Sequence, residues 1–445
     1  MPHQRFIQKV ETKQATVAVI GLGYVGLPLA VAFAEAAIPT IGFDIDREKV
    51  DTLLNGGSYL LDVSAAAIAT HARAGRLVPT TDEAVLDRVD AAVICVPTPF
   101  TKAKAPDLTS VIASAEMVAR HLRRSQLVVL QSTTYPGTTE EVVRPILERT
   151  GLRVGQDFCL AFSPERIDPG NRKYGIANTP KVVGGCTTGC TAAAAALFGV
   201  LIGPDQIHQV SGPKAAEMCK LLENTFRSVN IALVNELLEL CDRMGINLWE
   251  VIDAAATKPF GFMPFYPGPG VGGHCIPIDP YYLAWKAREY DFYTKFIELA
   301  AETNASMPSY TVHRVTEALN RAGRPLNGAR ILVLGVAFKP NIDDSRNSPA
   351  LEVLKLLAAW GAEVTYHDPY IPKVILSEHR SPSGASTLES VPLTAARLQA
   401  QDCVLVAVAH RDFDLPWIVR QSPLLVDAQN ATRMVREGRE KIVQL

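Results

Sequence analysis

The chain has 445 residues, 48% of them hydrophobic, and a formal net charge of −2 at pH 7. This near-neutral globular composition, without long blocks of like charge, argues against nucleic-acid partners and against attachment to an acidic membrane surface. At about 150 residues per domain, the length suggests roughly three domains. The eight cysteines are scattered and do not form the pattern of a disulfide framework, which favours the reducing cytoplasm as location. Only Cys186 and Cys190 lie close together, and because a second pair of ligands is lacking we expect no metal site.

Residues 1–14 are polar, and we expect them to be loosely held. Residues 17–38 form an apolar run that hydropathy alone would assign to a membrane span. Three glycines and Pro28 divide this run into a strand, a turn and a helix, and no basic segment with a cleavage site frames it. We therefore predict no membrane segment.

The same run carries the pattern of a dinucleotide-binding fold. A strand at 16–20 leads into Gly21-Leu22-Gly23-Tyr24-Val25-Gly26, a helix at 27–37 and a second strand at 40–43 that is followed by Asp44. The first glycine permits a tight turn, the second lets a pyrophosphate approach, and the third lets helix and strand pack closely. Asp44 would bind ribose hydroxyls and repel a 2′-phosphate, which favours NAD over NADP; the alternative is a solvated turn acid.

The alternation of strands and helices continues to about residue 212. Strands are predicted at 91–96, 127–130 and 158–162, followed respectively by Pro97-Thr98-Pro99, by the hydroxyls at 132–134 and by Glu165. Ligands gather at the carboxyl ends of parallel strands, so this edge is expected to line the cofactor. The alternatives are that the hydroxyls only cap the next helix and that Glu165 is a surface acid.

From residue 213 the pattern becomes helical. Residues 214–244 have apolar side chains at helical spacing and no internal Gly or Pro. Lys220, Asn224 and Arg227 share one face of this helix, which is either a solvated polar stripe or part of a site. Further helices are predicted at 278–290, at 294–304 and, restarting at Met307-Pro308, up to residue 322.

Residues 268–279 form a segment that we call the cysteine loop. Four glycines in six positions precede Cys275, and Asp279 follows four residues after it. Glycine lets a backbone approach a ligand closely. A cysteine in such a loop, with a nearby carboxylate, is typical of a positioned thiolate; the alternative is a small buried side chain, the ordinary state of a cysteine.

A second α/β block begins near residue 325. It has predicted strands at 330–334, 363–366, 403–409 and 424–426, a helix at 349–360 and a loop at 378–389. It lacks a full glycine fingerprint, but Lys339 and Arg346 follow its first strand, where cations suit a nucleotide diphosphate. The predicted fold class is α/β: two Rossmann-like domains, 1–212 and 325–445, joined by a long central helix and a helical middle domain, 213–324.

Together these motifs resemble the nucleotide-sugar 6-dehydrogenases, the UDP-glucose/GDP-mannose dehydrogenase family. The resemblance covers nearly the whole chain and rests on segments 21–26, 95–99, 163–166, 216–224, 268–279 and 338–346. It implies an NAD cofactor, a UDP-sugar substrate and a homodimer formed through the helical middle. It also implies a four-electron oxidation, in which the sugar C6 alcohol becomes an aldehyde, a cysteine traps it as a thiohemiacetal, a second oxidation gives a thioester, and hydrolysis releases the acid.

By motif position, the resemblance assigns Cys275 as the nucleophile, Lys220 and Asn224 as stabilisers of the oxyanion, and Glu165, Asp279 and Thr133 as groups that handle protons and water. A cation near Cys275 would also lower the pKa of its thiol. The expected substrate-binding residues are Glu165, Arg166, Lys220, Asn224, Tyr266, Gly272 and Lys339, the last of which would hold the phosphates. The expected cofactor-binding residues are Gly21, Gly23, Tyr24, Val25, Gly26, Asp44, Lys49, Pro97, Thr98, Thr133 and Arg346.

Within the family, residues 260–280 and 304–308 resemble the UDP-N-acetylglucosamine 6-dehydrogenase branch, which feeds cell-surface polysaccharide synthesis. Ile278 stands where the UDP-glucose branch usually has lysine, and the arginine that this branch sends across the dimer has no clear match near residues 258–260. The alternatives are UDP-N-acetylmannosamine or UDP-glucose as substrate, a two-electron 3-hydroxyacid-type dehydrogenase without a nucleophilic cysteine, and a nucleotide-sugar-binding protein without activity.

Overall fold

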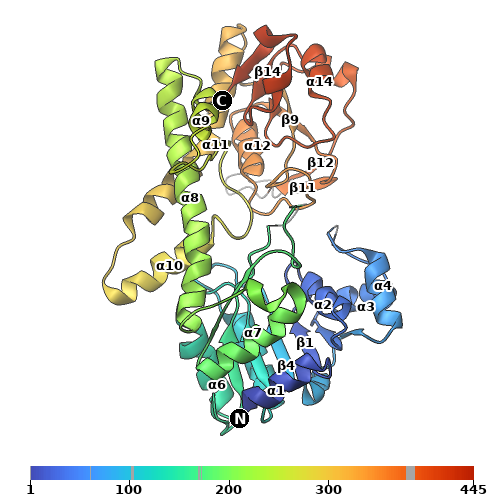
Figure 1. Ribbon diagram of the computed structural model, residues 1–445. Helices are drawn as coiled ribbons and strands as arrows, with labels where there is room; N and C mark the ends of the chain where they lie inside the picture. The colour runs from blue at the N-terminus through green and yellow to red at the C-terminus, as the bar shows by residue number, and fades with distance from the viewer. Residues whose placement is uncertain (1, 61, 102–104, 169–170, 172, 377–385) are drawn as a thin grey trace. The chain divides into compact units, whose positions relative to one another are not determined.

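The computed structural model describes residues 2–60, 62–101, 105–168, 171, 173–376 and 386–445 (Figure 1). The chain divides into two compact units. The first contains Met1–Glu223 and Tyr281–Tyr293, and the second contains Asn224–Pro280 and Thr294–Leu445. Two helices are each shared between the units: α8 (Pro213–Met244) and α10 (Asp279–Ala287). The predicted long central helix is α8, which is continuous from Pro213 to Met244.

The first unit is built on a large, mostly parallel sheet. Among the described residues the strand order is β3-β2-β1-β4-β5-β6-β7-β8, and only the β6–β7 pair is antiparallel. The strands are β1 (Val17–Ile20), β2 (Thr40–Phe43), β3 (Leu77–Thr80), β4 (Ala91–Ile94), β5 (Leu127–Leu130), β6 (Cys159–Phe162), β7 (Lys181–Gly185) and β8 (Ile207–Gln209). The first six strands follow the 3-2-1-4-5-6 order of a dinucleotide-binding fold, whose ligand crevice opens where the order reverses, between β1 and β4.

Helices cover this sheet, and its inner strands are buried along their whole length, as in other parallel sheets with two covered faces. The helices of this unit are α1 (Pro2–Glu11), α2 (Gly26–Glu35), α3 (Arg47–Leu54), α4 (Ala65–Arg73), α5 (Thr109–Arg120), α6 (Arg144–Glu148) and α7 (Thr188–Ile202). The expectation of a loose segment at 1–14 is wrong. Phe6 and Val10, four residues apart, bury one face of α1, and the helix packs against α7.

The second unit contains a parallel sheet with the order β10-β9-β13-β14-β15 among its described residues. Its strands are β9 (Arg330–Leu334), β10 (Glu363–His367), β13 (Cys403–Val406), β14 (Leu425–Asp427) and β15 (Ile442–Gln444). This is a 2-1-3-4-5 order, with its switch point between β9 and β13. The two parallel sheets confirm the predicted α/β class with two Rossmann-like domains.

The helices of the second unit are α9 (Leu248–Ala256), α11 (Lys295–Arg321), α12 (Pro349–Ala359), α13 (Ala395–Gln399) and α14 (Leu415–Gln421). The predicted break between two helices near residue 305 is wrong, because α11 continues through Pro308. A proline lacks the amide that would bond the carbonyl four residues earlier, here that of Asn304. That carbonyl lies against Gly270 of the cysteine loop, 3.2 Å from where a Cβ would stand. The helical hydrogen bond that Pro308 cannot make is thus missing at one carbonyl, that of Asn304, and this carbonyl faces the cysteine loop.

The predicted loop at 378–389 is only partly correct. Its last residues form β12 (Ser386–Glu389), which pairs antiparallel with β11 (Lys373–Leu376). Residues 377–385 lie outside the described part of the chain. No helix within the described ranges has both the length and the apolar character needed to cross a bilayer.

Candidate active site

The glycine turn after β1 leaves room for a phosphate beside the start of α2. Gly21 has a φ of 91°, and a Cβ there would come within 2.9 Å of the Cys95 carbonyl oxygen. A Cβ at Gly26 would lie 1.8 Å from the Gly21 carbonyl oxygen, whereas a Cβ at Gly23 would meet no atom within 4 Å. The two outer glycines therefore allow close packing, and the middle one keeps space open at a helix N-terminus, which fits the pyrophosphate of a dinucleotide.

Asp44 is buried at the end of β2, which excludes the alternative of a solvated turn acid. Its Oδ2 accepts a hydrogen bond from the Leu22 amide at 2.7 Å, and its Oδ1 accepts one from the Asp46 amide at 2.9 Å. The Lys49 ammonium lies 3.6 Å from Oδ2. The carboxylate is thereby held beside the glycine turn, at the place where the acid of an NAD-binding fold meets the ribose.

Two predicted cofactor residues meet at the carboxyl edge of the adjacent strands β4 and β5. The Thr98 hydroxyl donates to the Thr133 carbonyl at 2.7 Å, and the Thr98 carbonyl accepts from the hydroxyl of Tyr282 on α10. Pro97 is exposed beside them. Tyr282 was not anticipated, because a buried aromatic in a helix carries no motif of its own.

Glu165 is buried at the end of β6, so it is not the surface acid of the alternative reading. Its Oε2 accepts from the Gln131 amide group at 2.7 Å and lies 3.2 Å from the Lys181 ammonium. Its Oε1 accepts from the backbone amides of Arg166 and Ile167. Burial acts to raise the pKa of this carboxyl, but the charge of Lys181 and the hydrogen bonds outweigh it and hold the pKa below its ordinary value. Glu165 is therefore kept ionised, as a proton acceptor must be.

Neither Gln131 nor Lys181 was singled out from the sequence. Gln131 directly precedes the run of hydroxyls after β5, where a polar residue drew no separate attention. Lys181 is the first residue of β7, a strand that is buried throughout. A lysine is almost never fully buried without a partner, and its place at the head of an apolar strand is the signal that could have found it.

The start of α8 is anchored to the turn after β5. Glu217 is fully buried and accepts hydrogen bonds from the Gly137 amide at 2.6 Å and from both the amide and the hydroxyl of Thr139. One turn later, Lys220 is also buried. Arg166 donates to the Pro180 carbonyl at 2.7 Å and pairs with Glu223, the next acid on this helix, at 2.6 Å. Within the first unit, the start of α8 is thus fastened at two separate points, by Glu217 and by Glu223.

Asn224 lies one turn beyond Lys220 on the same face of α8, and it is buried as well. The burial of both residues excludes a solvated stripe at these positions. The side-chain amide of Asn224 donates to Oδ2 of Asp279 at 2.5 Å. Asp279 begins α10, and its amide donates to the Cys275 carbonyl at 2.7 Å. Within the second unit, Asn224 and Asp279 are therefore joined through their side chains, and Asp279 is joined to Cys275 through the backbone.

The cysteine loop is fastened to the segment after β9. The Gly273 amide donates to the Arg346 carbonyl at 3.2 Å, and the Asn347 side chain donates to the Gly273 carbonyl at 3.1 Å. A Cβ at Gly272 would lie 2.8 Å from Phe338, so the two segments touch backbone to side chain. Cys275 itself is half-buried, unlike an inert core cysteine.

Further along this segment, the guanidinium of Arg346 is held by both carboxylate oxygens of Asp344 and lies 3.3 Å from Nδ1 of His274. Lys339 is half-buried in the same loop. Tyr266, at the entrance to the cysteine loop, stacks on Trp249 and donates its hydroxyl to Asp253 at 2.7 Å. Within the described ranges, no group of three or more His, Cys, Asp or Glu residues is arranged to hold a metal ion.

Comparison with known proteins identifies the family. Models of the UDP-glucose/GDP-mannose dehydrogenase family match in three consecutive parts: the NAD binding domain at residues 15–202, the central domain at 214–306 and the UDP binding domain at 332–434. The chain belongs to the UDP-glucose/GDP-mannose dehydrogenase family. It is accordingly an NAD-dependent nucleotide-sugar dehydrogenase.

Relatives in this family match along most of their length. The chain is 36% identical over 402 residues to a UDP-N-acetyl-D-glucosamine 6-dehydrogenase of Pseudomonas aeruginosa, covering 90% of this chain and 92% of that one. It is also 36% identical over 411 residues to a UDP-N-acetyl-D-mannosamine dehydrogenase of Escherichia coli (strain K12), covering 90% and 94%. A solved structure of a UDP-D-ManNAc dehydrogenase from Pyrococcus horikoshii superposes with a TM-score of 0.86 at 31% identity, covering 96% of this chain and 98% of that one.

Proposed function

We propose that this dehydrogenase oxidises the C6 hydroxyl of UDP-N-acetylglucosamine to the carboxylic acid, in two oxidations joined by a covalent intermediate on Cys275. The observation that carries the proposal is the arrangement around the cysteine loop: a half-buried thiol follows a glycine segment, and Asp279 is held by Asn224. The glycine turn and Asp44 would hold NAD, which would supply the hydride acceptor, one molecule for each oxidation.

The residues of the chain supply the rest of the chemistry. In the first oxidation the C6 hydroxyl loses its proton and a hydride and becomes an aldehyde. The Cys275 thiolate adds to the aldehyde carbon, and the oxyanion of the resulting thiohemiacetal is stabilised by the Lys220 ammonium and the Asn224 amide. Loss of a second hydride gives a thioester. Water then adds to the thioester carbon, the C–S bond breaks, and the acid and the thiolate are released.

The carboxylates Glu165 and Asp279 take up the protons released at the hydroxyl and at the attacking water, with the Thr133 hydroxyl as a helper. Glu165, whose pKa is held below its ordinary value, is ionised and can therefore take up a proton. Arg166, Tyr266 and Gly272 contribute to the substrate site, and Lys339 binds the diphosphate. Arg346 contributes to cofactor binding. Three domains, at 1–212, 213–324 and 325–445, carry these functions in the cytoplasm, and the product enters cell-surface polysaccharide synthesis.

UDP-N-acetylmannosamine is the second candidate substrate, because a mannosamine dehydrogenase is as similar in sequence as the glucosamine enzyme. The deciding experiment measures NADH formed per sugar consumed, with UDP-N-acetylglucosamine, UDP-N-acetylmannosamine and UDP-glucose side by side. Two NADH per molecule on the first sugar alone supports the proposal. Two on another sugar keeps the chemistry and changes the substrate. One NADH with release of an aldehyde or ketone overturns the role of Cys275.

We further propose that two copies of the chain associate through α8. Large apolar side chains at spacings of four and seven residues, which share one face of a helix, are exposed to solvent on it: Met218, Leu222, Phe226, Leu233, Leu240 and Met244. An exposed apolar stripe of this length is characteristic of a protein contact surface. The homodimer implied by the family resemblance would cover it.

A further inference from the structure

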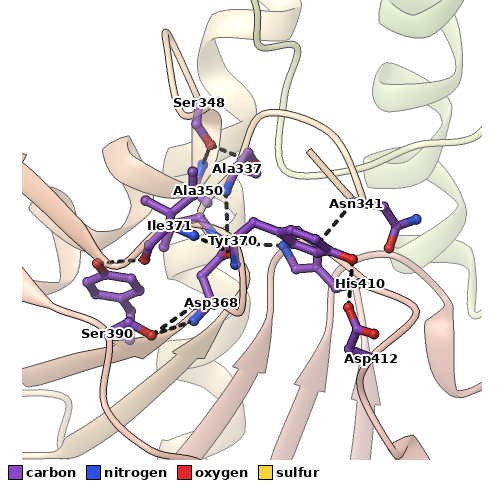
Figure 2. Close-up of polar contacts among 12 residues, drawn as sticks. Ala337, Asn341, Ser348, Ala350, Asp368, Tyr370, Ile371, Ser390, His410 and Asp412 are labelled. Carbon is purple, nitrogen blue, oxygen red and sulfur yellow. Dashed lines mark hydrogen bonds and ion pairs between the residues drawn. The ribbon is translucent and has the colours of Figure 1, made fainter. Parts of the chain in front are cut away.

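The loop that follows β9 carries Lys339 between two fixed points. Two residues before the lysine, the Ala337 amide donates to Oδ2 of Asp368 at 3.2 Å. Two residues after it, the Asn341 amide donates to Nδ1 of His410 at 2.9 Å. Nε2 of His410 lies 3.0 Å from Oδ2 of Asp368, so the two side chains link the two ends of this segment. Figure 2 shows both residues with their backbone partners. We call residues 335–348 the nucleotide loop.

The hydrogen-bond pattern fixes the state of His410. Because Nδ1 accepts from a backbone amide, it carries no proton, and Nε2 must carry the hydrogen that is donated to Asp368. Both side chains are 0% exposed, so no water competes for these bonds. Asn341 is fastened a second time, because its side-chain oxygen accepts from the Arg411 amide at 2.8 Å.

Asp368 is saturated by donors. Besides His410 and Ala337, its oxygens accept from the amides of Val336, Tyr370 and Ile371. Burial acts to raise the pKa of this carboxyl, but the bonds from His410 and the backbone outweigh it and hold the pKa below its ordinary value. A buried carboxylate that accepts this many hydrogen bonds is a rigid anchor for the nucleotide loop.

The first sheet has an aspartate at the position that corresponds to Asp368, but its neighbours differ. Asp44 and Asp368 each follow the second strand of their sheet and each bind an amide of the turn after the first strand. Asp44 has the ammonium of Lys49 at 3.6 Å, whereas Asp368 is capped by a buried histidine. In the first sheet this acid is expected to bind a ribose, whereas the corresponding acid of the second sheet supports the loop after the first strand.

We propose that His410 is a positioning residue for substrate binding: by joining the two sides of Lys339 through Asp368, it sets the affinity of the nucleotide loop for the substrate diphosphate. The proposal rests on the proposed function, in which Lys339 binds that diphosphate. His410 does not touch the substrate. It fixes the course of the backbone on both sides of the residue that does.

Two conservative replacements of His410 test its two hydrogen bonds separately, the one from Asn341 and the one to Asp368. His410→Asn keeps an acceptor near the place of Nδ1 and loses the donor to Asp368, whereas His410→Gln keeps a donor near the place of Nε2 and loses the acceptor for Asn341. Binding of UDP and of uridine to the full chain is measured by calorimetry, together with the melting temperature. We expect UDP to bind about three- to tenfold more weakly to each variant, as for the loss of one buried hydrogen bond, with uridine unchanged.

A purely structural role gives a different result. It lowers the melting temperature while UDP affinity, measured well below the transition, stays at the wild-type value, and this outcome overturns the proposal. A Lys339→Met variant shows whether the underlying assumption holds. If this variant binds UDP normally, the phosphate role of Lys339 is wrong and the proposal falls with it; if it binds weakly while both His410 variants bind normally, only the proposal is wrong.

The double variant His410→Asn with Lys339→Met completes the test. If His410 acts through Lys339, adding His410→Asn to the Lys339→Met background causes no further loss of UDP affinity. Independent, multiplying losses would show that His410 does not act through Lys339.

Discussion

The side-chain amide of Asn224 lies 2.5 Å from Oδ2 of Asp279, which joins the middle of α8 to the first residue of α10. Asp279 is in turn tied to Cys275 by a backbone hydrogen bond. The neutral Asn224 side chain satisfies one oxygen of this carboxylate with a donated hydrogen bond. Replacing the side-chain nitrogen of Asn224 with oxygen is therefore expected to have a large effect on activity.

Asn224→Asp replaces the donor to Asp279 with a second carboxylate, and repulsion between the two like charges favours the uptake of a proton. We expect kcat to fall by about 100-fold or more, and the acid side of the pH–rate profile to move to higher pH, because like-charge repulsion raises the pKa of the pair. The measurement is kcat against pH. Asn230→Asp, on the exposed part of the same helix, is the matched control and should leave both unchanged.

Cys275→Ser tests the covalent step. A serine hydroxyl is a far weaker nucleophile than a thiolate, and we expect complete oxidation to slow by at least about 1,000-fold, with fewer than two NADH formed per sugar. Product analysis by mass spectrometry checks for the acid. Cys241→Ser, another half-buried cysteine, should behave like the wild type. Full conversion to the acid by the Cys275→Ser enzyme would contradict the thioester mechanism.

Lys181→Met removes the charge that lowers the pKa of Glu165. Burial then dominates, the pKa of Glu165 rises, and the acid limb of kcat/KM moves to higher pH. The stability that Glu165 contributes is present above the pKa of the unfolded side chain and is lost as pH falls through the lower folded value, so this contribution shrinks in the variant. Lys173→Met, an exposed lysine of the same unit, is the control. An unchanged pH profile would show that Glu165 is not the base that limits the rate.

Asp44→Ala removes the acceptor expected to bind the ribose and the bond to the Leu22 amide. We expect KM for NAD to rise about tenfold or more and the preference for NAD over NADP to decrease, with KM for the sugar nucleotide unchanged. Asp51→Ala, on the exposed side of α3, serves as the comparison. Equal kinetic constants for the two variants would remove Asp44 from the cofactor site.

Leu233→Lys tests the proposed association along α8. Leu233 is 53% exposed in the single chain, and a buried charge at a contact between two copies is costly. Light scattering after size-exclusion chromatography should show a dimer for the wild type and for Trp360→Lys, a change at another exposed apolar residue, and a monomer for Leu233→Lys. A wild-type monomer would exclude the association.

Much of the fold could be predicted because its signals are local. The glycine turn, the helix after it and Asp44 lie within one short stretch of sequence, and the apolar spacing of α8 continues without a break over its 32 residues. The shared face of Lys220 and Asn224 follows from helical geometry alone. The short helix α1 was missed because only two apolar residues mark its buried side. The continuity of α11, though not its helical character, was missed because Pro308 is a stop signal in most helices.

The missed site residues have partners far away in the sequence. Lys181 meets Glu165 only because β7 lies beside β6, and His410 meets Asp368 only because β13 and β10 flank β9. No local pattern distinguishes His410 from an ordinary polar residue after a strand, and the local signal for Lys181, its place at the head of an apolar strand, does not reveal its partner. Pairings across a sheet become visible only when the strand order is known, which periodicity does not provide.

The proline inside α11 has a consequence for how this protein could be stabilised. A proline in the interior of a helix ordinarily costs about 3 kcal/mol, and the carbonyl that Pro308 leaves without a helical partner is the one that lies against Gly270. A replacement of Pro308 that strengthens the helix would draw this carbonyl back into the helical ladder and away from the loop that carries Cys275. We therefore expect a Pro308 variant with a higher melting temperature to have a lower turnover, and both quantities are to be measured on the same variant.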